Sequence, residues 1–243
     1  MDFFLKLKDD FVLNFVNDNR WKWLIDGLKN TLVITFFALL MGLAIGIVIA
    51  IIRSTFDKNK EVYKKRGGLF YFVWWIMNAI SNLYLTVVRG TPVVVQLLIA
   101  YFIIFASSRN GTMIAIFAFG LNSGAYVAEI IRGGIMSIDN GQFEAGRSVG
   151  FNYVQTMIYI IIPQVFKSIL PTLCNEFIVL IKETSVAGYV GIADLTKAGE
   201  RIRGVTFSAF MPLIAVALIY LVVVIILTQL VKILERNLRK NER

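Results

Sequence analysis

TLVITFFALLMGLAIGIVIAII, residues 31–52, runs from end to end without a charged side chain. A helix that crosses a lipid bilayer needs about 20 consecutive and mostly apolar residues. This stretch therefore predicts a membrane-spanning helix. FMPLIAVALIYLVVVIILTQLV, residues 210–231, meets the same condition. Together the two stretches indicate an integral membrane protein.

Three weaker candidates lie between these two stretches. The first covers residues 91–106, and we expect its helix to begin earlier, near Ser81. The second covers residues 112–131, and the third covers residues 166–186, which contain several charged side chains. We therefore expect an all-α membrane protein with about five transmembrane helices and no other domain fold.

The composition agrees with this class. Hydrophobic residues make up 57% of the 243 residues, and the mean hydropathy is +0.70. A soluble domain contains roughly 45–50% apolar residues. The net charge is +9, and such an excess can indicate nucleic-acid binding or topology signals in membrane loops. The long apolar stretches favour topology signals.

The distribution of Lys and Arg predicts the orientation. With five helices, residues 53–91, 132–168 and 232–243 lie on one side, and they hold fifteen Lys and Arg against nine on the other. The richer side is expected to be cytoplasmic. The N-terminus is then outside and the C-terminus cytoplasmic.

This orientation divides the chain into three parts. Phe4, Leu7, Phe11 and Phe15 recur at helical spacing, which predicts an interfacial helix in the N-terminal segment. The expected parts are an N-terminal interfacial segment 1–26, a transmembrane domain 27–235 and a cytoplasmic tail 236–243.

Several kinds of chemistry are excluded. The sequence has no His and only one Cys, Cys174, so it offers no His-based metal site, no Ser–His or Cys–His pair and no intrachain disulfide. It has neither a GxxxxGK[ST] phosphate loop nor a GxGxxG loop. We expect no catalytic residue, metal or cofactor on this chain. Any ATP would be bound by another chain.

Two of the expected transmembrane helices carry polar stripes. Asn122, Tyr126 and Glu129 align on one side of the third helix, roughly opposite a row of small residues that suits helix packing. Asn175, Glu176 and Glu183 share a face of the fourth helix with Thr172 and Lys182. Such residues face the interior of a helix bundle or a water-filled path. A solute path and a structural pairing of charges both remain open.

Residues 132–168 are too polar to span a membrane. Gly146 and Gly150 separate two short helical patterns, and Pro163 is expected to close the second. A polar helix pair of this kind can dock into a groove of a cytoplasmic partner, although an ordinary loop would have a similar pattern.

The same residues resemble a known motif. Glu144-Ala145-Gly146, then Gly150, then Ile160-Ile161-Ile162-Pro163 resemble the EAA–x3–G–x9–I–x–L–P motif of permease subunits of ABC-type importers. Three further segments are similar to the polar amino acid branch of that family: Val88-Arg89-Gly90-Thr91-Pro92, the segment from Leu121 to Gly134, and the segment from Asn175 to Ser185. The sequence departs from the motif at Gly146, where the family has Ala, and at Ile162, where it has Leu.

The resemblance implies a function and a set of partners. The chain would be the permease subunit of an ATP-driven uptake transporter for polar amino acids, in a prokaryotic cell membrane. It would pair with a second permease chain, two cytoplasmic ATP-binding subunits that hold ATP and Mg²⁺, and an extracytoplasmic solute-binding protein.

The resemblance also assigns residues. A cytoplasmic coupling-helix loop between the third and fourth helices, within residues 132–165, would contact the ATPase. Its implied residues are Glu144, Ala145, Gly146, Arg147, Gly150 and Pro163. The implied substrate path is lined by Asn122, Ser123, Tyr126, Glu129, Asn175, Glu176, Glu183, Thr184 and Ser185.

Other functions remain as alternatives. A stand-alone channel or secondary transporter for a small polar solute would use the same intramembrane side chains without ATP. A membrane enzyme and a non-transporting assembly subunit are further alternatives. The charged tract 53–68 is expected to be a cytoplasmic loop that anchors the topology. Within it, residues 57–66 exceed the minimum of the resembled family, as do the N-terminal 25 residues, and the sequence gives no further role for either.

Overall fold

The computed structural model describes residues 2–240, and side chains within 5–238. Helices follow one another with short connections, and no strand occurs in the part of the chain so described. In chain order they are α1 (Asp2–Phe11), the π-helix η1 (Val12–Val16), the 3-10 helix η2 (Asn17–Asn19), α2 (Trp21–Arg66), α3 (Gly68–Gly90), α4 (Val93–Ile99), the π-helix η3 (Ala100–Ile104), α5 (Gly111–Ser137), α6 (Asn140–Ser148), α7 (Tyr153–Thr156), the π-helix η4 (Met157–Ile161), α8 (Ile162–Glu183), the 3-10 helix η5 (Thr184–Val190), α9 (Leu195–Thr206) and α10 (Phe210–Lys240).

The expected all-α membrane fold is confirmed. Within residues 2–240, five helical segments are long and apolar enough to cross a membrane. They are Trp21–Arg66, Gly68–Gly90, Gly111–Ser137, Tyr153–Val190 and Phe210–Leu238. Four of them contain the stretches that the sequence predicts.

The second span differs from the prediction. We expected one helix from near Ser81 to residue 106, but α3 begins at Gly68 and ends at Gly90. Thr91 is extended, with φ −120° and ψ 144°, because the ring of Pro92 excludes the helical conformation of the residue before it. Residues 93–104 form a separate short apolar helix.

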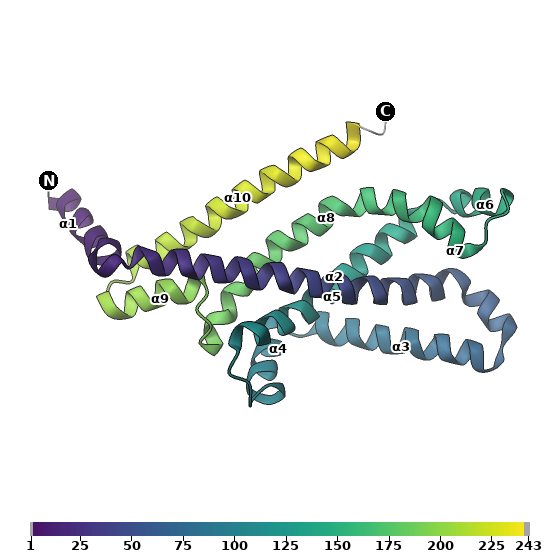
Figure 1. The fold of residues 1–243 in the computed structure, drawn as a ribbon, viewed down its shortest axis with the longest axis horizontal. Helices are drawn as coiled ribbons and strands as arrows, with labels where there is room; N and C mark the ends of the chain where they lie inside the picture. The colour runs from purple at the N-terminus through teal and green to yellow at the C-terminus, as the bar shows by residue number, and fades with distance from the viewer. Residues whose placement is uncertain (1, 241–243) are drawn as a thin grey trace. The chain divides into compact units, whose positions relative to one another are not determined.

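Helix α2 extends well past the apolar stretch that marks it in the sequence. It has 46 residues, which corresponds to about 70 Å at 1.5 Å per residue. The charged tract that follows Arg53 is therefore helical as far as Arg66 and not an irregular loop. Figure 1 shows this part of α2 beside α3, running in the opposite direction. Tyr63 stacks on Trp74, with ring centroids 5.3 Å apart, and joins the two helices.

Contacts divide the chain into two compact units. Unit 1 contains the described residues up to Ala38, with Val93–Phe119 and Phe177–Leu230. Unit 2 contains Leu39–Pro92, Gly120–Glu176 and the described residues from Val231 onward. Helices α2, α5, α8 and α10 contribute residues to both.

In unit 2, small residues let α2 and α5 pack closely. A Cβ atom on Gly42 would lie 3.0 Å from Cβ of Ser123, and one on Gly46 would lie 2.5 Å from Cγ1 of Val127. Ala125 and Ala128 form a buried cluster with Leu85 of α3. The predicted packing role of the small residues on α5 is confirmed.

In unit 1, the N-terminal segment packs on α9. Phe15 joins a buried apolar cluster with Leu195 and Ile202. The side chain of Asn14 is fully buried, and its Oδ1 accepts a hydrogen bond of 2.8 Å from Thr206. Asp194 caps the start of α9 by accepting from the backbone N–H of Lys197, at 2.8 Å. The interfacial position of residues 1–26 stays a prediction.

Candidate functional site

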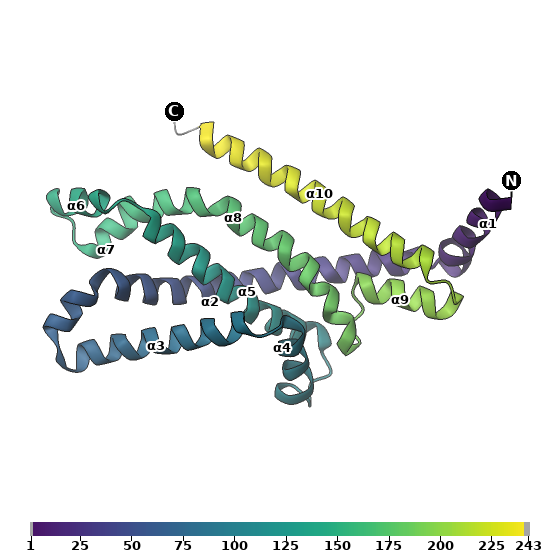
Figure 2. The same ribbon diagram turned by 180° about the vertical axis from the view of Figure 1, so that it is seen from behind.

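The residues of the predicted coupling loop form a helix pair in unit 2. Helix α6 begins after Asp139, whose carboxylate accepts from the N–H of Gly141 at 2.6 Å. Helix α7 begins after Asn152, which forms a reciprocal capping box with Gln155. Figure 2, seen from behind, shows α6 and α7 at the same end of unit 2 as the connection between α2 and α3.

Gly150 makes the turn between these two helices. Its φ is +85°, a conformation that favours glycine because a side chain would clash with the backbone. The N–H of Phe151 then reaches back to the carbonyl of Gly146, at 3.0 Å. The predicted separation of two helical patterns at Gly150 is confirmed.

Gly146 does not separate the two helices, contrary to the prediction from the sequence; it allows them to pack closely. It lies inside α6 and is buried against α7. A Cβ atom at this position would lie 2.6 Å from both Cγ2 and Oγ1 of Thr156. Because Thr156 is itself 2% exposed, the close approach of the two helices requires glycine here.

Pro163 does not close the second helical pattern, so that prediction is wrong. Helix α7 continues through η4 into α8, and Pro163 is the second residue of α8. Inside a continuous helix Pro163 supplies no N–H, and the N–H of Ile162 just before it bonds to the carbonyl of Met157 in the π-helical pattern. The widened π-helical turn η4 precedes it and allows the chain to stay helical.

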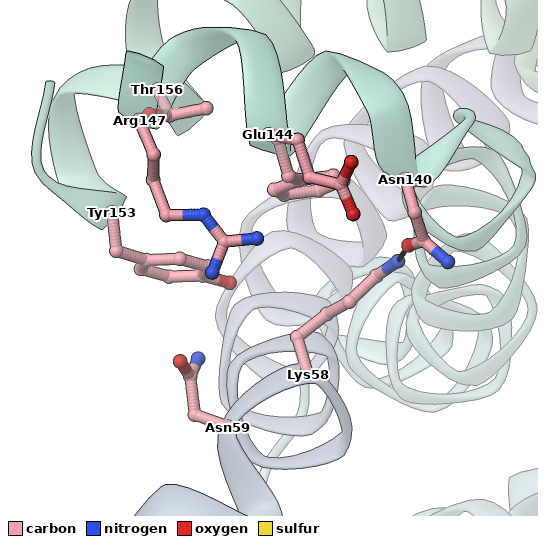
Figure 3. A pocket seen from close by; sticks show the side chains of 8 residues that line it. Lys58, Asn59, Asn140, Glu144, Arg147, Tyr153 and Thr156 are labelled. Atoms are coloured by element: carbon pink, nitrogen blue, oxygen red, sulfur yellow. Dashed lines mark hydrogen bonds between the residues drawn. The ribbon is translucent and has the colours of Figure 1, made fainter. Parts of the chain in front are cut away.

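The extension of α2 contacts the helix pair. Lys58 donates a hydrogen bond of 2.8 Å to Oδ1 of Asn140, and its ammonium lies 4.6 Å from the centroid of the Phe143 ring. A cavity of about 290 Å³ opens between α2 and the helix pair, and Glu144 and Arg147 also line it. Figure 3 shows Lys58 and Asn59 reaching toward it from α2.

The helix pair presents a mixed surface to solvent. Glu144, Ala145 and Arg147 are exposed on α6. Val149 and Val154 are 69% and 60% exposed on either side of the Gly150 turn. Charged and apolar groups side by side on a turn suit contact with another protein. The structure brings together all the predicted coupling residues except Pro163.

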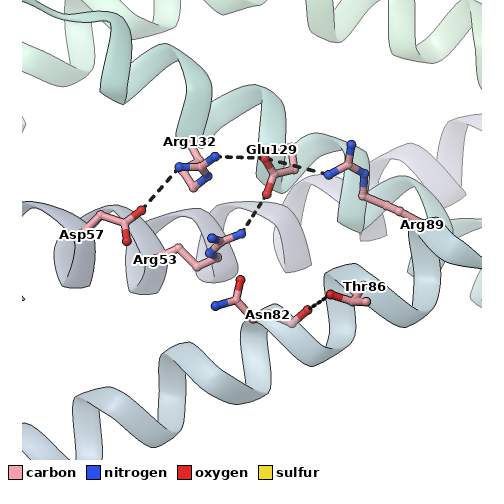
Figure 4. A network of polar contacts seen from close by, with 7 residues as sticks. All are labelled: Arg53, Asp57, Asn82, Thr86, Arg89, Glu129 and Arg132. Carbon is pink, nitrogen blue, oxygen red and sulfur yellow. Dashed lines mark hydrogen bonds and ion pairs between the residues drawn. The ribbon is translucent and has the colours of Figure 1, made fainter.

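A charged cluster in unit 2 was not predicted. Nη1 of Arg53 in α2 lies 2.9 Å from Oε1 of Glu129, and Nη2 of Arg132 lies 3.3 Å from Oε2. Arg132 also lies 3.4 Å from Asp57 of α2, and Arg89 of α3 lies 4.0 Å from Glu129 (Figure 4). The Lys and Arg count places Arg53, Arg89 and Arg132 among the topology signals, and the spacing within a single helix does not show that they meet Glu129.

Most of the predicted path residues of unit 2 are packed within the chain. Asn122, Ser123 and Glu176 are buried, and the hydroxyl of Ser123 donates to Glu176 at 3.0 Å. This hydrogen bond joins α5 to α8. Tyr126 is half-buried, and Asn175 is exposed.

The remaining predicted path residues belong to unit 1. Thr184 is fully buried and donates to the carbonyl of Ile181 at 2.8 Å, and its hydroxyl lies 3.4 Å from that of Thr35. Glu183 and Ser185, on either side of it, are half-buried. Ser185 lines a cavity of about 380 Å³ together with Lys197 and Glu200 of α9.

Comparison with known proteins gives the family. The family model for the binding-protein-dependent transport system inner membrane component matches residues 67–240. The arginine transport system permease protein ArtQ of Bacillus subtilis is 37% identical over 224 residues, which cover 90% of this chain and 94% of that protein. The glutamine transport system permease protein GlnP of Escherichia coli is 36% identical over 220 residues, covering 89% and 93%.

Solved structures agree in fold. A chain of an amino acid ABC transporter, crystallised with histidines, superposes with a TM-score of 0.78 at 36% identity, covering 92% of this chain and 98% of that one. A chain of the inward-facing MetNI methionine ABC transporter superposes with a TM-score of 0.69 at 20% identity, covering 90% and 96%. The second likeness concerns the fold alone. With five candidate spans and a family match over most of its length, the chain belongs to the inner membrane components of binding-protein-dependent transport systems.

Proposed function

We propose that this chain is the permease subunit of an ATP-driven uptake transporter for polar amino acids, in a prokaryotic cell membrane. One observation carries the proposal. Two amino acid permeases and one amino acid transporter chain align at 36–37% identity over about nine-tenths of the chain. The solute class therefore rests on likeness along the whole membrane domain.

The transporter contains further subunits. A second permease chain completes the path, two cytoplasmic ATPase subunits hold ATP and Mg²⁺, and an extracytoplasmic binding protein delivers the solute. This chain itself binds no cofactor and catalyses no reaction. Its N-terminus lies outside and its C-terminus in the cytoplasm, in keeping with the excess of Lys and Arg on the α6–α7 side.

Helices α6 and α7 couple the ATPase to the membrane helices. The exposed Glu144 and Arg147 suit charged contacts with the ATPase, and the exposed Val149 and Val154 suit its apolar surface. Helix α7 continues into α8 through η4, so a force on the turn reaches a transmembrane helix directly. Closure of the ATPase dimer then rocks the helices as rigid bodies and alternates access.

The predicted path residues divide into two groups by burial. The exposed or half-buried side chains of Tyr126, Asn175, Glu183 and Ser185 line the path and present hydrogen-bonding groups to a zwitterion. The buried side chains of Asn122, Ser123, Glu176 and Thr184 hold the helices that shape it. Glu129 belongs to the charged cluster of unit 2.

Reconstitution tests the proposal. The chain is purified with its ATPase and second permease chain, placed in proteoliposomes and supplied with binding protein and labelled L-arginine or L-glutamine. We expect uptake only when ATP is present on the ATPase side. Uptake by this chain alone, driven by a solute or ion gradient, would instead establish the secondary-transporter alternative.

Labelling tests the orientation separately. Single cysteines at Val149 and at Tyr189 are exposed to a membrane-impermeant maleimide, after Cys174 is replaced by Ala. The first should react only in broken cells and the second in intact cells. The reverse pattern would place the α6–α7 turn outside and would overturn the coupling role.

A further inference from the structure

The charged cluster of unit 2 contains more positive than negative groups. Arg53 and Arg132 face Glu129 and Asp57 at 2.9–3.4 Å, so these four side chains balance in charge. Arg89 is the fifth member. Its guanidinium shares Glu129 with the two other arginines and lies 4.0 Å from it, at the limit of an ion pair. Among the side chains that the structure describes, the cluster thus carries one positive charge in excess.

The excess charge lies on the most accessible member. The side chain of Arg89 is 45% exposed, compared with 16% for Arg53 and 27% for Arg132. Both oxygens of Glu129 already face closer guanidinium groups, so much of the fork of Arg89 is available to another acceptor.

The surroundings of Arg89 hold its guanidinium in place. The guanidinium carbon lies 5.7 Å from the centroid of the Tyr126 ring, a cation–π distance. The carboxylate of Glu129 also lies within 4.0 Å of the group, and Arg89 is the penultimate residue of α3, directly before the break at Thr91 and Pro92. Asn82 and Thr86 lie on the same face of α3 as Arg89, at helical spacing (Figure 4).

An accessible cation within a membrane domain calls for an anionic partner. A charged group in a spanning segment is costly unless it pairs or faces water. A planar guanidinium with free N–H groups matches a carboxylate through two parallel hydrogen bonds. We propose that Arg89 binds the carboxylate of the transported solute, with Tyr126 and Glu129 as positioning residues. This inference rests on the proposed function.

In this proposal Arg89 recognises the α-carboxylate of the solute. Every amino acid carries an α-carboxylate, so Arg89 selects the class of solute and not the individual side chain. The ring of Tyr126 and the carboxylate of Glu129 keep the guanidinium of Arg89 in one orientation, which limits the conformational entropy lost when the solute binds.

The test measures binding to the complex of permease chains and ATPase without the binding protein, so that the solute bound by that protein does not contribute to the signal. L-Arginine and L-glutamine are compared with their carboxamides, argininamide and glutaminamide. For the native complex we expect an amino acid to bind at least about tenfold more tightly than its carboxamide, as for a hydrogen bond to a charged group.

Variants then locate this preference. Arg89→Gln should weaken binding of the amino acid by about tenfold or more and leave the carboxamide nearly unchanged. Arg89→Lys should keep part of the preference, because an ammonium retains the charge but not the fork. The matched control is Arg236→Gln, at an exposed position near the end of α10, which should behave as the native complex.

Several results would overturn the inference. One is an unchanged preference in both Arg89 variants, and another is a native complex that shows no preference. An anionic lipid headgroup is the other source of a similar anion, so the measurements are made in nanodiscs of phosphatidylcholine with and without phosphatidylglycerol. An effect of Arg89→Gln only with phosphatidylglycerol would assign Arg89 to lipid. Amino acid uptake by the native complex would still support the proposed function in each case.

Discussion

Lys58 of α2 and Asn140 of α6 are joined by a hydrogen bond of 2.8 Å, although 82 residues separate them in the sequence. Lys58 lies beyond the apolar stretch of α2, in the charged tract for which the sequence gives no role beyond topology. Asn140 is the first residue of the helix that we assign to ATPase contact. The helix pair is thus braced by the first transmembrane helix in addition to the two helices that it connects.

Replacing Lys58 by Leu tests this brace. The variant loses the hydrogen bond and the ammonium–ring contact with Phe143, so α6 should move more freely against α2. The groups are partly exposed, and we expect a stability loss of about 1 kcal/mol or less. The number of solutes taken up per ATP hydrolysed should fall. The control is Lys60→Leu, at an exposed position of the same helix, and an equal fall in that variant would contradict the brace.

Gly150 should tolerate only residues that adopt a positive φ. Gly150→Val forces a β-branched side chain into φ +85°, and the turn between α6 and α7 should deform. We expect insertion and assembly to persist while ATP hydrolysis becomes uncoupled from uptake. Gly150→Asn, which enters the left-handed region more readily, should retain more coupling. Normal coupled uptake in Gly150→Val would remove the docking role of this turn.

Gly146→Ala places a methyl group 2.6 Å from Thr156. Overpacking of this kind costs about 1–3 kcal/mol, so the helix pair should separate and uptake should fall. The double variant Gly146→Ala with Thr156→Ala removes both of the closest atoms and should recover uptake. Uptake and thermal unfolding of the complex are measured for both. The absence of any recovery would mean that Gly146 acts through a different contact, such as the ATPase itself.

Asp194 gives a prediction on stability and pH. It caps α9, so Asp194→Ala should destabilise unit 1 by about 1 kcal/mol, and Asp194→Asn, which keeps an acceptor, by less. Burial raises the pKa of the Asp194 carboxyl, partly opposed by the N–H groups of Lys197 and Thr196.

The sign of the pH dependence follows from that direction. As pH rises above about 3.9, the unfolded carboxyl loses its proton before the folded one, so the free energy of unfolding falls until the raised pKa is passed. Asp194→Asn lacks this contribution. Thermal unfolding of the purified complex should therefore show the native chain losing stability relative to Asp194→Asn as pH rises from 4. A difference that does not change with pH would contradict the raised pKa.

Glu183 is the charged member of the predicted path in unit 1. Glu183→Gln keeps the shape and removes the charge, so uptake should change in KM or in the solute stimulation of ATP hydrolysis. The control is Glu61→Gln, an exposed carboxylate of α2 outside the predicted path. If the kinetics of Glu183→Gln are identical to those of the native complex, Glu183 does not line the solute path.

Much of the fold could be read from the chain because a bilayer imposes simple rules on it. Residues 31–52 and 210–231 contain no charge and are long enough to span a bilayer, so their insertion as helices can be predicted without knowing how they pack. The second span was misplaced because Asn78, Ser81 and Asn82 lower the hydropathy of α3, while residues 93–104 look more apolar. The correct boundary is marked in the sequence by Pro92, which disfavours a helical conformation at Thr91.

The candidate site was less predictable. Gly150 could be predicted because a turn between helices has a local sequence pattern. The packing role of Gly146 depends on its contact with Thr156, ten residues away. Asn122 and Asn175 look alike in the sequence, yet the first is 2% exposed and the second exposed. Burial of this kind depends on helix packing, which spacing within a single helix does not specify.

The sequence by itself determined that the chain is a helical membrane protein, and its motifs identified the family of transport components. Only the tertiary structure decided that Lys58 bonds to Asn140 of α6 and that Arg53, Arg89 and Arg132 gather around Glu129. The physical reason is range. The length of an apolar helix depends only on consecutive residues, so it can be predicted from the sequence. The partner of a charged side chain depends on how helices far apart in the chain pack together.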